Sequence, residues 1–203
     1  MNSLEIRNGI NHLIDMDPVL RRIISQTQTC RIKRRKNYYP SLVKAIINQQ
    51  LSVKAGESIY KKFSAHFGKS VKPENVAATP VEEIRKFGLS NAKAIYVKDL
   101  SEKIMTNQLS FKKISQKSND EIIGELTKVK GIGVWTAHMF LIFTLGRLDV
   151  LPVGDLGIKN AIRRNYQLKE LPDENKIAAL CEKKKWKPYQ SIASWYLWMS
   201  LEL

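Results

Sequence analysis

The chain has 203 residues, and its 34 Lys and Arg against 19 Asp and Glu give a formal net charge of +15. With 43% hydrophobic residues it can fill a substantial core without disulfide or metal staples, which excludes disordered and fibrous classes. Cys30 and Cys181 are too few for a disulfide framework, a four-thiolate zinc site or an iron–sulfur cluster, so we expect a reducing compartment.

Helical periodicity runs through most of the chain, and alternating strand-like patterns are almost absent. Apolar residues spaced by three and four predict one helix through residues 42–47 and another through 53–67, with a break near 49–52. Further helices are predicted at residues 80–87, 91–105, 119–129, 135–145, 156–166, 173–184 and 188–201. Only residues 148–153 look extended. The pattern predicts one compact all-α unit, and glycines and prolines at the proposed ends agree with it.

Positive charge gathers in two clusters. Five of the six residues from Arg31 to Lys36 are basic and Tyr38 and Tyr39 follow, while lysines surround Trp186 between positions 183 and 187. Such clusters neutralise the phosphates of nucleic acids, but solubility or attraction to anionic membranes accounts for them as well. Charge alone leaves these three interpretations open.

No segment resembles a leader or a membrane span. Residues 1–11 lack a basic stretch followed by an apolar one, and no apolar run approaches the ~18 to 20 residues that a span needs. We therefore expect a soluble intracellular protein with no membrane partner, in the cytoplasm or on the nucleoid, or in the nucleus of a eukaryote.

Residues 126–137 predict two helices joined by a tight turn. The first helix ends near Val129, Gly131, Ile132 and Gly133 form the turn, and the second helix begins at once. The glycines let the backbone adopt positive φ and leave bare N–H groups at a helix N-terminus, which is a site for an anion. Given the charge, a DNA phosphate is the natural occupant, although a helical hairpin without a ligand has the same pattern.

Three segments together resemble the helix-hairpin-helix DNA glycosylase superfamily, in particular its 3-methyladenine DNA glycosylase II branch. The first is residues 46–55. The second is residues 126–137, which we call the hairpin, together with the loop from Gly146 to Asp155 that follows in the sequence. The third runs from Trp186 to Trp198. They occur in the order of the family and cover most of the chain from Pro40 onward. Longer members carry a further N-terminal domain, whereas before Pro40 we expect only a short helical lead-in.

The resemblance implies the domain organisation. We expect residues 1–203 to form a single all-α catalytic domain with two lobes. The N-terminal and C-terminal helices would form one lobe and the middle helices the other, with the active site in the cleft between them.

Asp155 is the catalytic residue that the resemblance implies. Cleavage of an N-glycosidic bond builds positive charge on the deoxyribose, which a carboxylate stabilises while it orients the attacking water. Asp155 also precedes a predicted helix, so it is a candidate N-cap, and both roles are compatible. We interpret Asp149, six residues earlier, as structural.

The resemblance also implies a base pocket lined by Trp135, Met139 and Trp198. Alkylation at N3 or N7 makes a purine cationic, so the base leaves without much protonation and is attracted to electron-rich aromatic faces. Core packing is the alternative interpretation for each tryptophan. Met139 stands where the family's alkyladenine member has a third aromatic residue. Trp135 stands where bifunctional relatives of the endonuclease III type have a lysine nucleophile, so we predict a monofunctional hydrolase.

Further residues are expected to contact DNA. Gln50 or Leu51, in the break, is the candidate wedge that fills the space of the extruded base, unless the break is a polar interruption with Leu51 packed inward. Phosphate contacts are expected from the Gly131 and Gly133 amides and from three lysines. These lysines are Lys128, Lys130 and Lys159.

We expect no cofactor for catalysis and no iron–sulfur cluster. In helix-hairpin-helix proteins the hairpin carbonyls often hold a monovalent cation that bridges to a phosphate. By this resemblance the carbonyls of Thr127, Val129 and Ile132 are the candidate ligands of a Na⁺ or K⁺ ion.

The sequence thus predicts a monomeric, monofunctional DNA glycosylase of base excision repair. Its substrate is duplex DNA with an alkylated purine, 3-methyladenine or 7-methylguanine, and its product is an abasic site. Two alternatives stay open: a non-catalytic helix-hairpin-helix DNA-binding module, and a glycosylase for other damaged bases.

Overall fold

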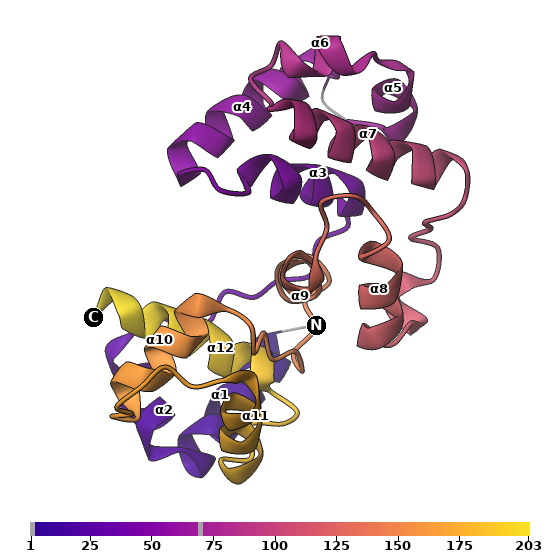
Figure 1. Ribbon diagram of the computed structural model, residues 1–203. Coiled ribbons are helices and arrows are strands. Elements are labelled where there is room, and N and C mark those ends of the chain that lie inside the picture. The colour runs from indigo at the N-terminus through magenta and orange to yellow at the C-terminus, as the bar shows by residue number, and fades with distance from the viewer. Residues whose placement is uncertain (1–2, 69–70) are drawn as a thin grey trace. The chain divides into compact units, whose positions relative to one another are not determined.

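The computed structural model describes residues 3–68 and 71–203, and every regular element among them is a helix (Figure 1). The all-α prediction is therefore confirmed. The chain divides into two compact units, which we call the terminal unit (Met1–Arg35 and Leu141–Leu203) and the middle unit (Lys36–Phe140). None of the helices in the described ranges is long and apolar enough to cross a membrane. The cleft expected between two lobes stays a prediction.

The middle unit is built around one long helix. Its helices are α3 (Tyr38–Asn48), α4 (Val53–His66), α5 (Pro73–Ala78), α6 (Val81–Arg85), α7 (Asn91–Met105), η1 (Ile114–Gln116), α8 (Asn119–Leu126) and the greater part of α9 (Val134–Phe143). α7 packs against α3, α5 and α6 (Figure 1). Its buried residues Ala94, Val97, Leu100 and Ser101 follow the three- and four-residue spacing of a helix face.

Local caps explain why the predicted starts of α7 and α8 are confirmed. The Ser90 hydroxyl accepts the Lys93 N–H at the start of α7, and Ser118 forms a reciprocal capping box with Glu121 at the start of α8. α7 has the predicted bounds. α5 was not predicted, because six residues are too few to show a helical period.

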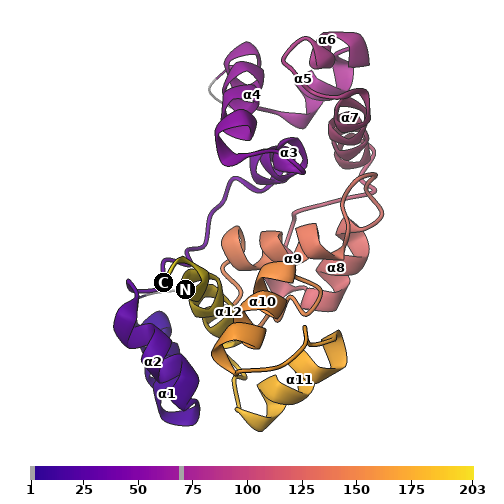
Figure 2. The same ribbon diagram turned by 60° about the vertical axis from the view of Figure 1, so that its left-hand side comes forward.

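The terminal unit contains α1 (Ser3–Met16), α2 (Pro18–Gln26), α10 (Leu156–Asn165), α11 (Glu174–Lys183), α12 (Gln190–Met199) and η2 (Ser200–Glu202). α12 is its core element, because every residue from Gln190 to Leu197 is buried. It packs against α1, α2 and α10 (Figure 2). Residues 148–153 form no strand, so the prediction of an extended segment was wrong; turn hydrogen bonds from Val153 to Leu151 and from Asp155 to Pro152 bend the chain there.

A fully buried carboxylate, Asp17, joins α2 to distant parts of the terminal unit. Its Oδ1 accepts the Val19 N–H at 2.9 Å and caps α2. Its Oδ2 accepts the Trp186 Nε1–H at 2.9 Å and the Tyr166 hydroxyl at 2.5 Å, and the Lys184 ammonium lies 3.9 Å from Oδ1. Burial, and then the contact with Asp17, raises the pKa of Tyr166, so this phenol stays a donor. Trp186, at the centre of the second lysine cluster, is therefore a core residue.

We expect Asp17→Ala to lower the free energy of unfolding by about 3–5 kcal/mol, because it leaves a buried indole N–H and a phenol without their acceptor. Urea unfolding followed by circular dichroism measures this loss. Asp15→Ala, an exposed aspartate of α1, is the control and should change stability by less than about 0.5 kcal/mol. Equal, small losses in both variants would show that the buried carboxylate does not hold the unit together.

Candidate active site

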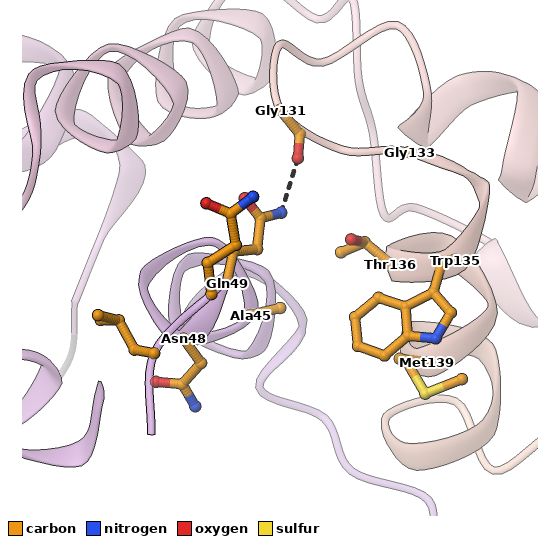
Figure 3. Close-up of a pocket in the computed structure, with 10 residues that line it drawn as sticks. Ala45, Asn48, Gln49, Gly131, Gly133, Trp135, Thr136 and Met139 are labelled. Carbon is orange, nitrogen blue, oxygen red and sulfur yellow. Dashed lines mark hydrogen bonds between the residues drawn. The ribbon is translucent and has the colours of Figure 1, made fainter. Parts of the chain in front are cut away.

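The middle unit holds a pocket of about 670 Å³ between the end of α3 and the start of α9 (Figure 3). Its lining residues are Ala45, Asn48, Gln49, Gln50, Leu51, Gly131, Gly133, Trp135, Thr136 and Met139. The candidate wedge residues, the hairpin glycines and two candidate base-pocket residues thus lie around one cavity. Thr136, which is buried, was not among the predicted residues.

A hydrogen bond joins the two walls of this pocket. The Gln49 side-chain Nε2 donates to the Gly131 carbonyl at 2.7 Å (Figure 3). Gly131 has φ of +77°, and a Cβ there would lie 2.1 Å from Cδ2 of Tyr96. Glycine is therefore required both for the turn and for the close approach of a ring. Gly133 does not share the positive φ that we expected of both hairpin glycines.

α7 supports both walls from one face. The Lys93 Nζ donates to the carbonyls of Ile47 at 2.8 Å and Gln49 at 2.5 Å, so an ammonium caps the C-terminus of α3. Two turns on, the Asp99 Oδ2 accepts the Lys130 N–H of the hairpin at 2.9 Å. Burial lowers the pKa of Lys93. Sequence reasoning missed these residues, although positions 93, 96 and 99 share one face of a helix.

The break between α3 and α4 has a strained backbone. Gln50 is exposed and has φ of +55°, a left-handed conformation that a residue with a side chain seldom adopts. Leu51 is 39% exposed, so the interpretation that it packs inward is wrong. The Ser52 hydroxyl accepts the Ala55 N–H and starts α4. The break therefore presents two side chains, Gln50 and Leu51, to the outside.

Trp135 and Met139 stand one turn apart on α9 and line the pocket opposite α3 (Figure 3). Trp135 is 50% exposed, so core packing does not account for it. Met139 is partly buried. This wall offers an aromatic face and a thioether to whatever enters the pocket.

Asp155 lies in the terminal unit, where it caps α10 as the sequence predicts. Its Oδ1 accepts the Ile158 N–H at 2.8 Å and the Trp198 Nε1–H at 2.9 Å, and the residue is 8% exposed. A Cβ at position 157 would lie 3.0 Å from that oxygen and 3.1 Å from Cδ1 of Trp198, so Gly157 leaves room for the contact. Trp198 also stacks near Phe143, with ring centroids 5.7 Å apart. The pairing of Trp198 with Asp155 was not foreseen.

Hydrogen bonds attach the loop before Asp155 to the start of α12. The Gln190 Nε2 donates to Asp149 Oδ1 at 2.5 Å, the Val150 N–H donates to the Ser191 hydroxyl at 3.0 Å, and the Ser191 N–H donates to the Leu148 carbonyl at 2.9 Å. These bonds agree with a structural role for Asp149. They also fix the chain that leads to Asp155.

The basic residues proposed for DNA contact are divided between the units. Lys128 and Lys130 are exposed beside the hairpin, whereas Lys159 is partly buried in α10 of the terminal unit. The cluster from Arg31 to Lys36 forms a non-helical segment before α3, and its basic side chains are exposed. The described parts of the chain contain no group of three or more His, Cys, Asp or Glu arranged to hold a metal.

Comparisons with known proteins show the family to which this chain is similar. The model of the family described as HhH-GPD superfamily base excision DNA repair protein matches residues 43–188. A putative DNA-3-methyladenine glycosylase of Bacillus subtilis is 35% identical over 171 residues, 81% of this chain and 59% of the relative. DNA-3-methyladenine glycosylase 1 of Schizosaccharomyces pombe is 33% identical over 198 residues, 95% of this chain and 86% of the relative.

A solved structure matches as well: the 3-methyladenine DNA glycosylase of Schizosaccharomyces pombe in complex with abasic DNA. It has a TM-score of 0.84 and 31% identity, and the match covers 97% of each chain. The chain therefore belongs to the HhH-GPD superfamily of base excision DNA repair proteins, within the branch of the 3-methyladenine DNA glycosylases. This confirms the family that the sequence resembles.

Two lysines of α7 allow a test of how the pocket is held. We expect Lys93→Met to lower the free energy of unfolding by about 1–3 kcal/mol, because two carbonyls lose their donor. Lys98→Met is the matched control, since Lys98 donates to the carbonyls of Ala77 and Thr79 at the end of α5 in the same way.

Amide hydrogen exchange distinguishes the two variants. Lys93→Met should speed exchange of the Leu51 N–H, which donates to Asn48, and Lys98→Met should speed exchange of the Thr79 N–H, which donates to Val76. If both variants affected the two amides alike, Lys93 would not be a local support of the break.

Proposed function

We propose that this chain is a monofunctional DNA glycosylase that hydrolyses the N-glycosidic bond of alkylated purines, 3-methyladenine and 7-methylguanine, in duplex DNA. The observation that carries the proposal is the Asp155 carboxylate, held at a helix N-terminus by the Trp198 indole and a backbone N–H. Membership of a branch whose named members are DNA-3-methyladenine glycosylases supports the reaction. The relative solved with abasic DNA supports DNA as the partner and an abasic site as the product.

The proposed chemistry uses Asp155 as a fixed negative charge. As the base departs, positive charge develops on the deoxyribose, and a nearby carboxylate stabilises this state and orients the attacking water. Both hydrogen bonds to Oδ1 hold the side chain in one orientation, so little reorganisation is needed when the charge develops.

The pocket of the middle unit suits a flat cationic base. The face of Trp135 would attract an alkylated purine by stacking and cation–π interaction, worth ~1 to 2 kcal/mol when desolvated. Met139 adds a polarisable wall beside it. Because such a base already carries positive charge, it leaves without a strong general acid.

The proposed grip on DNA does not depend on sequence. The net charge of +15 attracts the phosphates, and the N–H groups of Gly131 and Gly133 with Lys128, Lys130 and Lys159 would contact the backbone. Gln50 or Leu51 would fill the space left by the extruded base, since both side chains reach out from the break.

A monovalent cation would add to this grip at the hairpin. The Val129 carbonyl accepts the Ile132 N–H at 3.1 Å, which uses one of its two lone pairs, so an oxygen acceptor is still present there. With the carbonyls of Thr127 and Ile132 it would provide neutral oxygen ligands, the type that Na⁺ or K⁺ takes. The ion would supply a positive charge that bridges the hairpin to a phosphate.

Asp155→Asn tests the reaction with little structural change. The asparagine Oδ1 can still accept both N–H donors, so we expect the variant to fold and to bind damaged DNA, yet to release the base several orders of magnitude more slowly. Free base measured by chromatography after incubation with methylated duplex gives the rate.

Asp173→Asn is the matched control, because Asp173 caps α11 by the same type of bond, to the Lys176 N–H at 2.7 Å. It should excise bases at the wild-type rate. Excision by Asp155→Asn at a rate near wild type would exclude the proposed role of this carboxylate.

Monofunctional hydrolysis leads to a separate expectation. Trp135 has no amine to attack the sugar, so borohydride should trap no covalent protein–DNA adduct during base release. An endonuclease III type enzyme on its own substrate is the positive control. A trapped adduct would overturn the prediction, and its loss in Lys130→Ala would identify the hairpin lysine as the nucleophile.

A further inference from the structure

One polar side chain of the pocket has no part in the reaction described above. Asn48, the last residue of α3, lines the cavity with Ala45, across from Trp135 and Met139 (Figure 3). Its Oδ1 is buried, and no described residue donates a hydrogen bond to it. A buried polar atom without a partner is uncommon in folded proteins and calls for an explanation.

The environment of this oxygen explains how the side chain is oriented. A Cβ at position 56, inside α4, would lie 2.2 Å from the Asn48 Oδ1 and 2.9 Å from its Cγ. Glycine weakens a helix interior, but at position 56 it leaves the space in which the carboxamide oxygen sits. With the oxygen buried there, Nδ2 is the polar end of the side chain that is left to the cavity lined by Asn48.

The two side-chain amides that follow Asn48 in the sequence are less available to a base in the pocket. The Gln49 amide is engaged with Gly131, and Gln50 is exposed at the break. Stacking on Trp135 accepts every base, because every base has a π-face. Discrimination between damaged bases therefore needs a directed hydrogen-bonding group, and a site built around such a group rejects a base that lacks the matching atom.

We propose that Asn48 is a specificity-determining residue of this pocket. Its Nδ2 donates a hydrogen bond to an acceptor of the extruded damaged base, a ring nitrogen or a carbonyl oxygen, while Gly56 holds the carboxamide in that orientation. This assignment rests on the proposed glycosylase function. It adds to it the atom that distinguishes one damaged base from another.

Asn48→Leu tests the assignment, because leucine has a similar size and no donor. Single-turnover excision is measured on duplexes with 3-methyladenine, 7-methylguanine or hypoxanthine, and affinity is measured for a duplex with an abasic site. Loss of one hydrogen bond should slow excision of at least one lesion about tenfold, and by different factors for different lesions. Affinity for abasic DNA should stay within about twofold, because that ligand has no base to contact Nδ2.

Asn175→Leu, an exposed asparagine of α11 in the terminal unit, is the matched control and should behave as wild type. Unchanged excision of all three lesions by Asn48→Leu would overturn the inference and leave the glycosylase function intact. An equal fall in abasic-DNA affinity and in excision would show a structural role instead. A wild-type protein that binds abasic DNA but excises no base would refute the proposed function, and the inference with it.

A double-mutant cycle tests the orienting role of Gly56 without DNA. Gly56→Ala alone should lower the thermal midpoint, because the new methyl displaces the Asn48 carboxamide. In an Asn48→Ala background the same change should raise the midpoint, since alanine is the better helix former. The sign reversal is the expected result, and the same sign in both backgrounds would remove the geometric basis of the inference.

Discussion

The hydrogen bond from Gln49 to the Gly131 carbonyl makes one pocket out of two segments that are 82 residues apart in the sequence. One partner follows the end of a helix and the other lies in a tight turn, so neither would have a fixed position alone. α7 supplies the support, because Lys93 caps the first segment and Asp99 holds the second. Hydrogen bonds therefore tie both walls of the pocket to α7 in the core of the middle unit.

The local features of the fold and of the candidate site could be predicted from the sequence, but the long-range contacts could not, for physical reasons. The break after α3, the hairpin and the N-cap at Asp155 leave local signatures, since breakers and caps act within a few residues. The contact of Trp198 with Asp155 spans 43 residues, and the donation from Lys93 ends on backbone carbonyls, which every residue has. Such tertiary contacts leave no pattern in a single sequence. The role of Gly56 was missed for the same reason. A glycine inside a helix indicates that another group packs close to the backbone, but the sequence does not say which group.

Asp155 combines a structural role with the proposed chemical one in a single side chain. A cap must face the first N–H groups of its helix, and in this protein the same oxygen also accepts the Trp198 indole. The candidate catalytic group is thus part of the element that positions it, and the loop before it is bound to α12 through Asp149. Such an arrangement fixes the carboxylate through hydrogen bonds of the protein itself.

The left-handed backbone of Gln50 also bears on what limits the stability of this protein. With φ of +55°, the position favours glycine, and a side chain there is held at a cost in folding free energy of the order of 1–3 kcal/mol. A search for stabilising substitutions would select glycine at this position and would thereby delete the side chain that reaches out of the break. Under the wedge role proposed for Gln50 or Leu51, stability and base excision would place opposite demands on position 50, and the most stable form of the chain would not be the most active one.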